Sequence, residues 1–284
     1  MKRNAIAGTH IIFAVPVVLL TLAAQPCRAD QPTPAAMRNY DSYIGQIEAR
    51  LTGRHQAVAG FLVPADEAKL RQGDLVIERV TPDPALGLRG AMLHHWRGTA
   101  FAPGAHAADF ERLMSDYAGY PKYFSPQVLS AHVLSHAGNH YQVTMRVQQK
   151  HVLTVVLDTA YDVGFGRLDP AHGYSISRST QISEIASPGT QNEHALTAAQ
   201  DHGFLWRLNT YWSYEERDGG LYLQIESVSL TRAIPPGLGW AIGPFVESVP
   251  RESLEFTLRS VCDALRKAAG APADVDAADE RKKP

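Results

Sequence analysis

The chain has 284 residues, of which 45% are hydrophobic, 20% charged and 8% aromatic. These proportions are ordinary for a globular protein and exclude a largely disordered chain, a collagen-like repeat and a small disulfide-rich scaffold. The 27 basic and 29 acidic residues give a formal net charge of −2, so no basic excess points to a nucleic-acid partner. The length suits one large domain or two small ones.

The N-terminal segment has the features of a secretory signal peptide. Two basic residues precede the apolar run 11–24, and a small-residue cleavage site ends at Ala29. Because the run contains Pro16 and is shorter than the roughly 20 apolar residues that span a bilayer, a cleaved signal over residues 1–29 is favoured over a membrane anchor. Cleavage leaves 255 residues and, since the signal holds three basic residues and no acid, a net charge of −5. The expected location is periplasmic or secreted.

One cysteine, Cys262, remains in the mature chain. An exported protein with a single thiol has no internal disulfide, so its core has to supply its stability. The surrounding pattern over 258–265 is helical, and Cys262 is predicted to be a small buried apolar residue rather than a nucleophile.

Residues 30–88 are predicted to form an N-terminal extension and a linker. Apolar residues recur at helical spacing from Tyr40 to Leu51,. A short helix is expected over 65–71 and a strand over 75–80. Two prolines then mark a linker, which places a domain boundary near residue 88.

Residues 89–269 predict a second domain with a clear order: a strand, two helices, six strands and a long helix. The expected elements are a strand over 91–101, helices over 107–117 and 120–124, strands over 127–135, 141–149, 152–165, 174–186, 204–216 and 221–232, and a helix that follows Gly237 and ends at Ala269,. Pro244 and Pro250 predict that this last helix bends or begins as two pieces. Residues 270–284 are small and charged and predict a disordered tail.

The dipeptide Asp218-Gly219 predicts a tight type I′ hairpin that fixes the register of two strands. In that register Tyr214 faces Leu223 and Trp212 faces Ile225. One face of the hairpin is then apolar, with Phe204, Trp206, Leu208, Trp212, Tyr214, Leu223 and Ile225, and the other is mostly polar, with Arg207, Asn209, Tyr211, Ser213 and Glu226. We expect the long C-terminal helix to cover the apolar face.

The order of elements resembles the START-like, or SRPBCC, superfamily, which includes Bet v 1-like proteins, polyketide cyclase/dehydratase proteins and lipid-transport proteins. The local sequences that carry the resemblance are 116–121 (DYAGYP), 216–220 (ERDGG) and 234–240 (IPPGLGW), within a matching stretch from about Gly90 to Ala269. The resemblance implies an α+β helix-grip fold, in which a curved seven-stranded antiparallel sheet wraps around a long C-terminal helix.

The resemblance also implies a cavity between sheet and helix that holds an apolar ligand, such as a lipid. The candidate ligand-binding residues are Trp206, Leu208, Trp212, Ile225, Trp240 and Phe245, together with Tyr161 and Arg178. For each aromatic residue alone, packing in the core is the competing interpretation, because aromatic stripes usually pack. The leading hypothesis is therefore binding, and transport, of a hydrophobic or amphipathic small molecule in the cell envelope.

The alternative is a cyclase/dehydratase-like or hydrolase-like enzyme that uses the same cavity. Its acid and base would come from Tyr161, Arg178, Arg207, Tyr211 and Glu226, yet the hairpin register turns the last three toward solvent or the N-terminal extension. No catalytic residue can be assigned from the sequence.

No cofactor and no metal site is expected. His132 and His136 are four residues apart, but they lie in a strand-like pattern, in which the helical ligand pair does not form,. Contact with a membrane surface and the oligomeric state stay open at this stage.

Overall fold

The computed structural model describes residues 31–57, 60–83, 86–150, 154–234 and 239–270, with the backbone alone for 239–247. The predicted signal peptide and the tail after residue 270 lie outside the described residues, as do the side chains of Trp240 and Phe245.

Five helices and nine strands make up the described part of the chain, with one 3₁₀ turn at Tyr117–Gly119. The helices are α1 (Pro34–His55), α2 (Glu67–Arg71), α3 (Ala107–Ser115), α4 (Tyr120–Tyr123) and α5 (Gly239–Ala268). The strands are β1 (Val76–Arg79), β2 (Ala91–Pro103), β3 (Val128–Ala137), β4 (His140–Lys150), β5 (Thr154–Arg167), β6 (His172–Ala186), β7 (His194–Ala195), β8 (Arg207–Arg217) and β9 (Gly220–Arg232).

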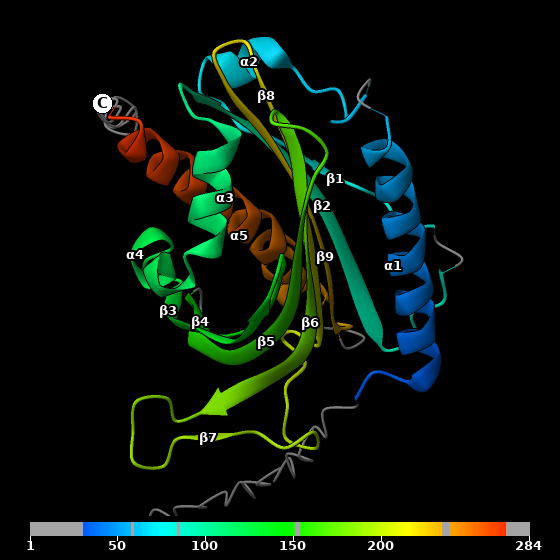
Figure 1. The fold of residues 1–284 in the computed structure, drawn as a ribbon. Helices are drawn as coiled ribbons and strands as arrows, with labels where there is room; N and C mark the ends of the chain where they lie inside the picture. The colour runs from blue at the N-terminus through cyan, green and yellow to red at the C-terminus, as the bar shows by residue number, and fades with distance from the viewer. Residues whose placement is uncertain (1–30, 58–59, 84–85, 151–153, 235–238, 271–284) are drawn as a thin grey trace, which may run out of the picture.

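The strands form one antiparallel sheet in the order β1-β2-β9-β8-β6-β5-β4-β3, and the short β7 pairs with β6. The sheet curls around α5 on one face, here called the inner face, while α1 runs along the opposite, outer face (Figure 1). This confirms the α+β helix-grip arrangement. The seven strands predicted for residues 89–269 all occur, as does the strand predicted over 75–80, which is β1. Strand β7 was not predicted. Because β1 pairs with β2, the sheet begins before residue 88.

The hairpin between β8 and β9 has the predicted turn and register. Asp218 and Gly219 have φ angles of 59° and 76°, which is the geometry of a type I′ turn,. The predicted pairs occur: Tyr214 with Leu223, Trp212 with Ile225, Thr210 with Ser227, Ser213 with Gln224, Tyr211 with Glu226 and Asn209 with Val228. The turn therefore decides which residues of the two central strands reach the inner face.

The inner core lies between the sheet and the second half of α5. Leu254, Leu258, Val261 and Leu265 recur at helical spacing and pack with Trp212, with Cys262 buried beside them,. The packing is closest at Gly98 of β2, where an added Cβ would lie 2.5 Å from Leu258 Cδ1. A residue without a side chain at this position lets the helix lie directly on the strand.

The last helix is continuous. Its assignment runs through Pro244 and Pro250 from Gly239 to Ala268, so the expectation of two pieces is wrong. A proline removes one backbone hydrogen bond, and the neighbouring turns can hold the helix together across that gap.

The outer core lies between α1 and the strands β2, β8 and β9. Its members are Ala36, Tyr40, Ile44, Ile47 and Leu51 from α1, with Ala91, Leu93, Trp206, Tyr211, Val228 and Leu230. Trp206 was expected on the inner face, and Phe204 is 41% exposed rather than covered. Both residues precede β8, which begins at Arg207, so the alternation of the strand does not fix their direction.

The contact at Gly98 gives a stability prediction. Gly98→Val should lower the free energy of unfolding by about 1–3 kcal/mol, because added methyl groups overpack a core that already holds Leu258,. The control is Gly45→Ala in α1, where an added Cβ meets nothing within 4 Å and should raise stability by up to about 1 kcal/mol. Urea unfolding measures both. Equal stability of Gly98→Val and the wild type would contradict the close packing.

Candidate functional site

The inner face of the sheet is divided into a packed half and an open half. In the packed half, Leu221, Leu223 and Tyr214 are buried in the cluster that holds the second half of α5. The open half lies further along the same strands, where the inward residues become polar. Thr210 and Ser227 there are half-buried, whereas Ser229 and Thr231 are buried. The two halves meet at Trp212 and Ile225.

The open half is centred on one row of side chains that crosses four strands. Ser177 of β6 pairs with Thr210 of β8, which pairs with Ser227 of β9, which pairs with Trp96 of β2. We call these four residues the hydroxyl row. All four are only half-buried, although they lie on central strands whose other face packs against α1. A side chain at such a place is exposed only if unfilled space lies in front of it.

The neighbouring rows continue the polar surface. Leu208, Ser229 and His94 form the next row, followed by Thr231 and Met92. His94 Nε2 lies 3.1 Å from Thr231 Oγ1. Burial and the nearby charge of Arg79 lower the pKa of His94 to about 4, so its imidazole is neutral at neutral pH,. No aspartate, glutamate, lysine or arginine occupies these rows. An inner position of β8 in the packed half holds Glu216, which binds His106 and the backbone N–H of Ala107.

Trp96 has an unusual environment for a half-buried tryptophan. Its Nε1 is inaccessible to solvent and has no hydrogen-bond acceptor within the described residues. An indole N–H is a donor only, so this buried group has its one hydrogen bond unmade within the described residues.

The structure distributes the predicted ligand-binding residues over three environments. Leu208 lies in the open half, Trp212 and Ile225 are buried core residues, and Tyr161 is buried in the inner cluster, where burial raises its pKa to about 12. Trp206 and Arg178 are on the outer face. Arg178 donates from Nε and Nη2 to the two carboxylate oxygens of Glu48 in α1, at 2.7 and 2.9 Å. It therefore holds the N-terminal helix.

The sequence analysis missed the hydroxyl row. A signal was present in β9, where the inward positions change from Leu221, Leu223 and Ile225 to Ser227, Ser229 and Thr231. When the inward residues of a strand change from aliphatic to hydroxyl-bearing, the two parts of the strand lie in different environments.

The polar face of the hairpin binds the N-terminal extension through Glu226. This carboxylate is 2% exposed and accepts from Arg50 at 2.6 and 3.1 Å, from Arg97 at 3.2 Å and from His95 Nε2 at 3.0 Å. Arg54 approaches to 3.8 Å. Arg207, Tyr211 and Glu226 thus point away from the inner face, as the register predicted.

Glu226 stays ionised because its partners outweigh its burial. Burial alone would raise the pKa of this carboxyl, but the hydrogen bonds from His95 and Arg50 and the charges of Arg50 and Arg97 hold it well below its usual range,. A carboxyl with a lowered folded-state pKa stabilises the fold at a pH above its ordinary pKa. As the pH falls, the unfolded chain takes up the proton first and the stabilisation is lost.

We therefore expect Glu226→Gln to lower the free energy of unfolding by about 3 kcal/mol at pH 7, since it leaves buried cations without their counterion. The difference from the wild type should shrink once the pH falls below about 4.5, the ordinary value,. Glu78→Gln is the matched control, because Glu78 binds the same Arg97 but is half exposed, and it should cost less than about 1 kcal/mol. Urea unfolding at several pH values measures both, and a pH-independent difference would contradict the assignment.

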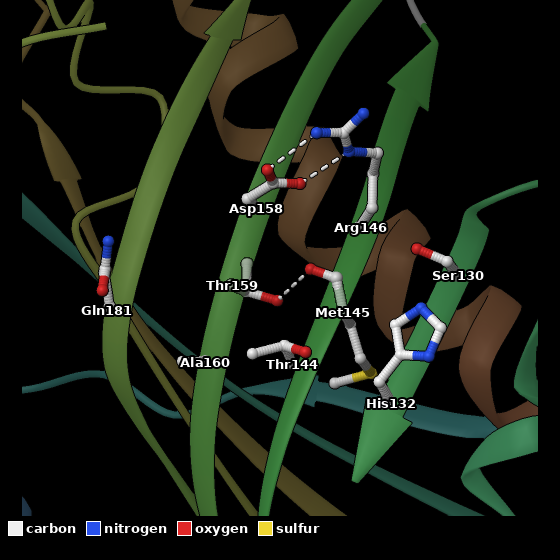
Figure 2. Close-up of a pocket in the computed structure, with 9 residues that line it drawn as sticks. All are labelled: Ser130, His132, Thr144, Met145, Arg146, Asp158, Thr159, Ala160 and Gln181. Carbon is white, nitrogen blue, oxygen red and sulfur yellow. Dashed lines mark hydrogen bonds and ion pairs between the residues drawn. The ribbon is translucent and has the colours of Figure 1, made fainter. Parts of the chain in front are cut away.

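Two hollows lie outside the space between the sheet and α5. The larger, of about 330 Å³, is on the outer face of β3–β6, and α5 passes behind these strands in Figure 2. Arg146 there binds both oxygens of Asp158 at 2.7 and 2.8 Å. The small side chains of Ala160 and Thr144 also line this hollow. The second, of about 250 Å³, lies between residues 60–67 and β8–β9. Both are open to solvent, and neither contains the hydroxyl row.

Other site types find little support in the described part of the chain. Its residues form no cluster of three or more histidine, cysteine or acidic side chains suited to a metal ion. None of its helices combines the length and apolar character needed to cross a membrane.

No protein-family model and no curated protein matches the sequence. Solved structures are similar in fold. A protein of Thermus thermophilus is 14% identical, with 61% of this chain and 97% of that chain covered and a TM-score of 0.44. A STAR-related lipid transfer protein of Xanthomonas axonopodis is 14% identical, with 67% and 98% covered and a TM-score of 0.43.

The Zhui aromatase/cyclase of a Streptomyces species is 17% identical, with 64% of this chain and 100% of that chain covered and a TM-score of 0.42. These proteins include a lipid transfer protein and an enzyme. At such identities and TM-scores, the function of this chain has to be inferred from its own residues.

Proposed function

We propose that the protein binds a hydrophobic or amphipathic small molecule in the space between the inner face of the sheet and the first half of α5. The observation that carries the proposal is the hydroxyl row, which lies on central strands of the inner face yet keeps its side chains partly exposed. Ligand sites of this kind are concave, mostly apolar and carry a few placed polar groups.

The chain around this space is well suited to an apolar ligand. Leu208 and Met92 lie within the polar rows, and the first three turns of α5, from Gly239 to Val249, have a single charged residue in their sequence, Glu247. Each buried methylene contributes about 0.8 kcal/mol, so a ten-carbon chain can supply up to about 8 kcal/mol before ordering costs. Burial of the ligand alone is enough for useful affinity.

The inner face supports a carrier better than an acid–base enzyme. General acid–base catalysis needs two titratable groups within reach of one point. The rows of the open half offer His94, whereas Tyr161 lies on β5, four strands away or about 19 Å at the usual strand spacing,. Tyr214 and Glu216 of β8 lie in the packed half and bind Glu111 and His106. Hydroxyl groups without a nearby base hold a ligand but do not transfer its protons.

Export to the cell envelope is part of the proposal and is supported by the sequence of residues 1–29,. N-terminal sequencing of protein recovered from the periplasm or the medium should begin at Asp30. Recovery of the uncut chain from the cytoplasm of its host would contradict export.

Ligand binding is tested by native mass spectrometry of protein purified from its host, which should show a bound apolar molecule. Ser227→Leu places a larger side chain in the hydroxyl row and should weaken binding about tenfold or more, because overpacking costs about 1–3 kcal/mol. Ser130→Leu, at a half-buried serine of the outer hollow, is the matched control and should leave binding unchanged. Absence of any bound molecule, with no thermal shift across a panel of lipids, would contradict the proposal.

A further inference from the structure

We propose that the ligand's polar group is uncharged and accepts or donates several hydrogen bonds along the hydroxyl row, as the glycerol head of a neutral glyceride does. This inference rests on the proposed function and specifies its ligand. It separates neutral amphipathic molecules from those that carry a phosphate.

The first step concerns the groups that the row offers. The hydroxyls of Ser177, Thr210 and Ser227 have no hydrogen-bond partner within the described residues, and Trp96 Nε1 likewise has no acceptor there. Adjacent strands are about 4.8 Å apart, so the three hydroxyls extend over about 10 Å. A hydroxyl can both donate and accept, which suits a ligand head with two or more neutral oxygens.

The second step concerns charge. A phosphate moved out of water needs cationic partners, and the inner positions of β2, β9, β8 and β6 hold no lysine or arginine,. The sequence from Ala233 to Pro250 has none either. The first cation of α5 is Arg251, which is half exposed and approaches Glu255 to 3.8 Å. His94 does not substitute for one, since its imidazole is neutral and bonded to Thr231.

The third step concerns the nearest cation. Arg79 of β1 pairs with Trp96 in register, so it lies at the end of the same row on the edge of the sheet. It is exposed and already has an interaction partner. Its charge therefore stays in water at the rim, while the hydroxyl row extends inward from it.

The test compares two molecules that differ only in the phosphate: 1-oleoylglycerol and 1-oleoylglycerol 3-phosphate. Both are titrated into the full mature protein, and dissociation constants are measured by calorimetry below the critical micelle concentrations. We expect 1-oleoylglycerol to bind at least about tenfold more tightly, because burial of an unpaired charge is more costly than burial of hydroxyl groups that find partners.

Variants then locate the head group. Thr210→Val keeps the side-chain shape but removes a hydroxyl. It should raise the dissociation constant of 1-oleoylglycerol about 2- to 10-fold, as expected for the loss of one hydrogen bond. Thr144→Val, the same change on the outer face of β4, should leave the affinity unchanged. An equal loss in both variants, or none in Thr210→Val, would overturn the role of the row.

The outcomes distinguish this inference from the proposed function. Tighter binding of the phosphate, abolished by Arg79→Gln, would show a charged head group held at the rim. That result overturns the inference and leaves ligand binding in place. If neither molecule binds, and no other lipid tested binds, the proposed function is overturned and the inference with it.

Discussion

The structure depends on the contact between the second half of α5 and the inner face of the sheet. At Gly98 the strand has no side chain, and Leu258 fills the space that one would take. This close approach buries the apolar rows from Leu221 to Ile225 and fixes the helix over the sheet. The strands are longer than this packed region, and beyond Ile225 the inward residues of β9 bear hydroxyl groups, of which Ser227 is half-buried and Ser229 and Thr231 are buried.

The N-terminal extension covers the outer face of the central strands, so these strands need cover from the rest of the fold on the inner face alone. Central strands that are open on both faces would expose too much polar backbone and apolar surface, but α1 closes the outer face with its own core. The polar residues that remain under α1 are held in place by charge, with Glu226 among three arginines and His95, and Arg178 on Glu48. Buried carboxylates need such partners. The charged residue Glu226 of the hairpin therefore stabilises the fold on the outer face. On the inner face, the rows beyond Trp212 and Ile225 carry hydroxyl groups and apolar side chains.

That division bears on function. The rows beyond Trp212 and Ile225 offer hydroxyl groups and apolar side chains around a neutral His94, which supports the proposed binding of an uncharged amphipathic molecule.

Local sequence determined the elements, the Asp218-Gly219 turn and the register of the hairpin, because turn chemistry and alternation act between neighbouring residues. It therefore also placed Arg207, Tyr211 and Glu226 opposite Trp212 and Ile225. Tertiary structure decided what covered each face. It turned Trp206, which precedes β8, toward α1, and it made Trp212 and Ile225 core residues. The hairpin register had already set Thr210 opposite Ser227, and the pairing of β6 with β8 and of β9 with β2 added Ser177 and Trp96 to the same row. Ser177 and Trp96 are far from the hairpin in the chain, and only the pairing of these strands makes them its neighbours.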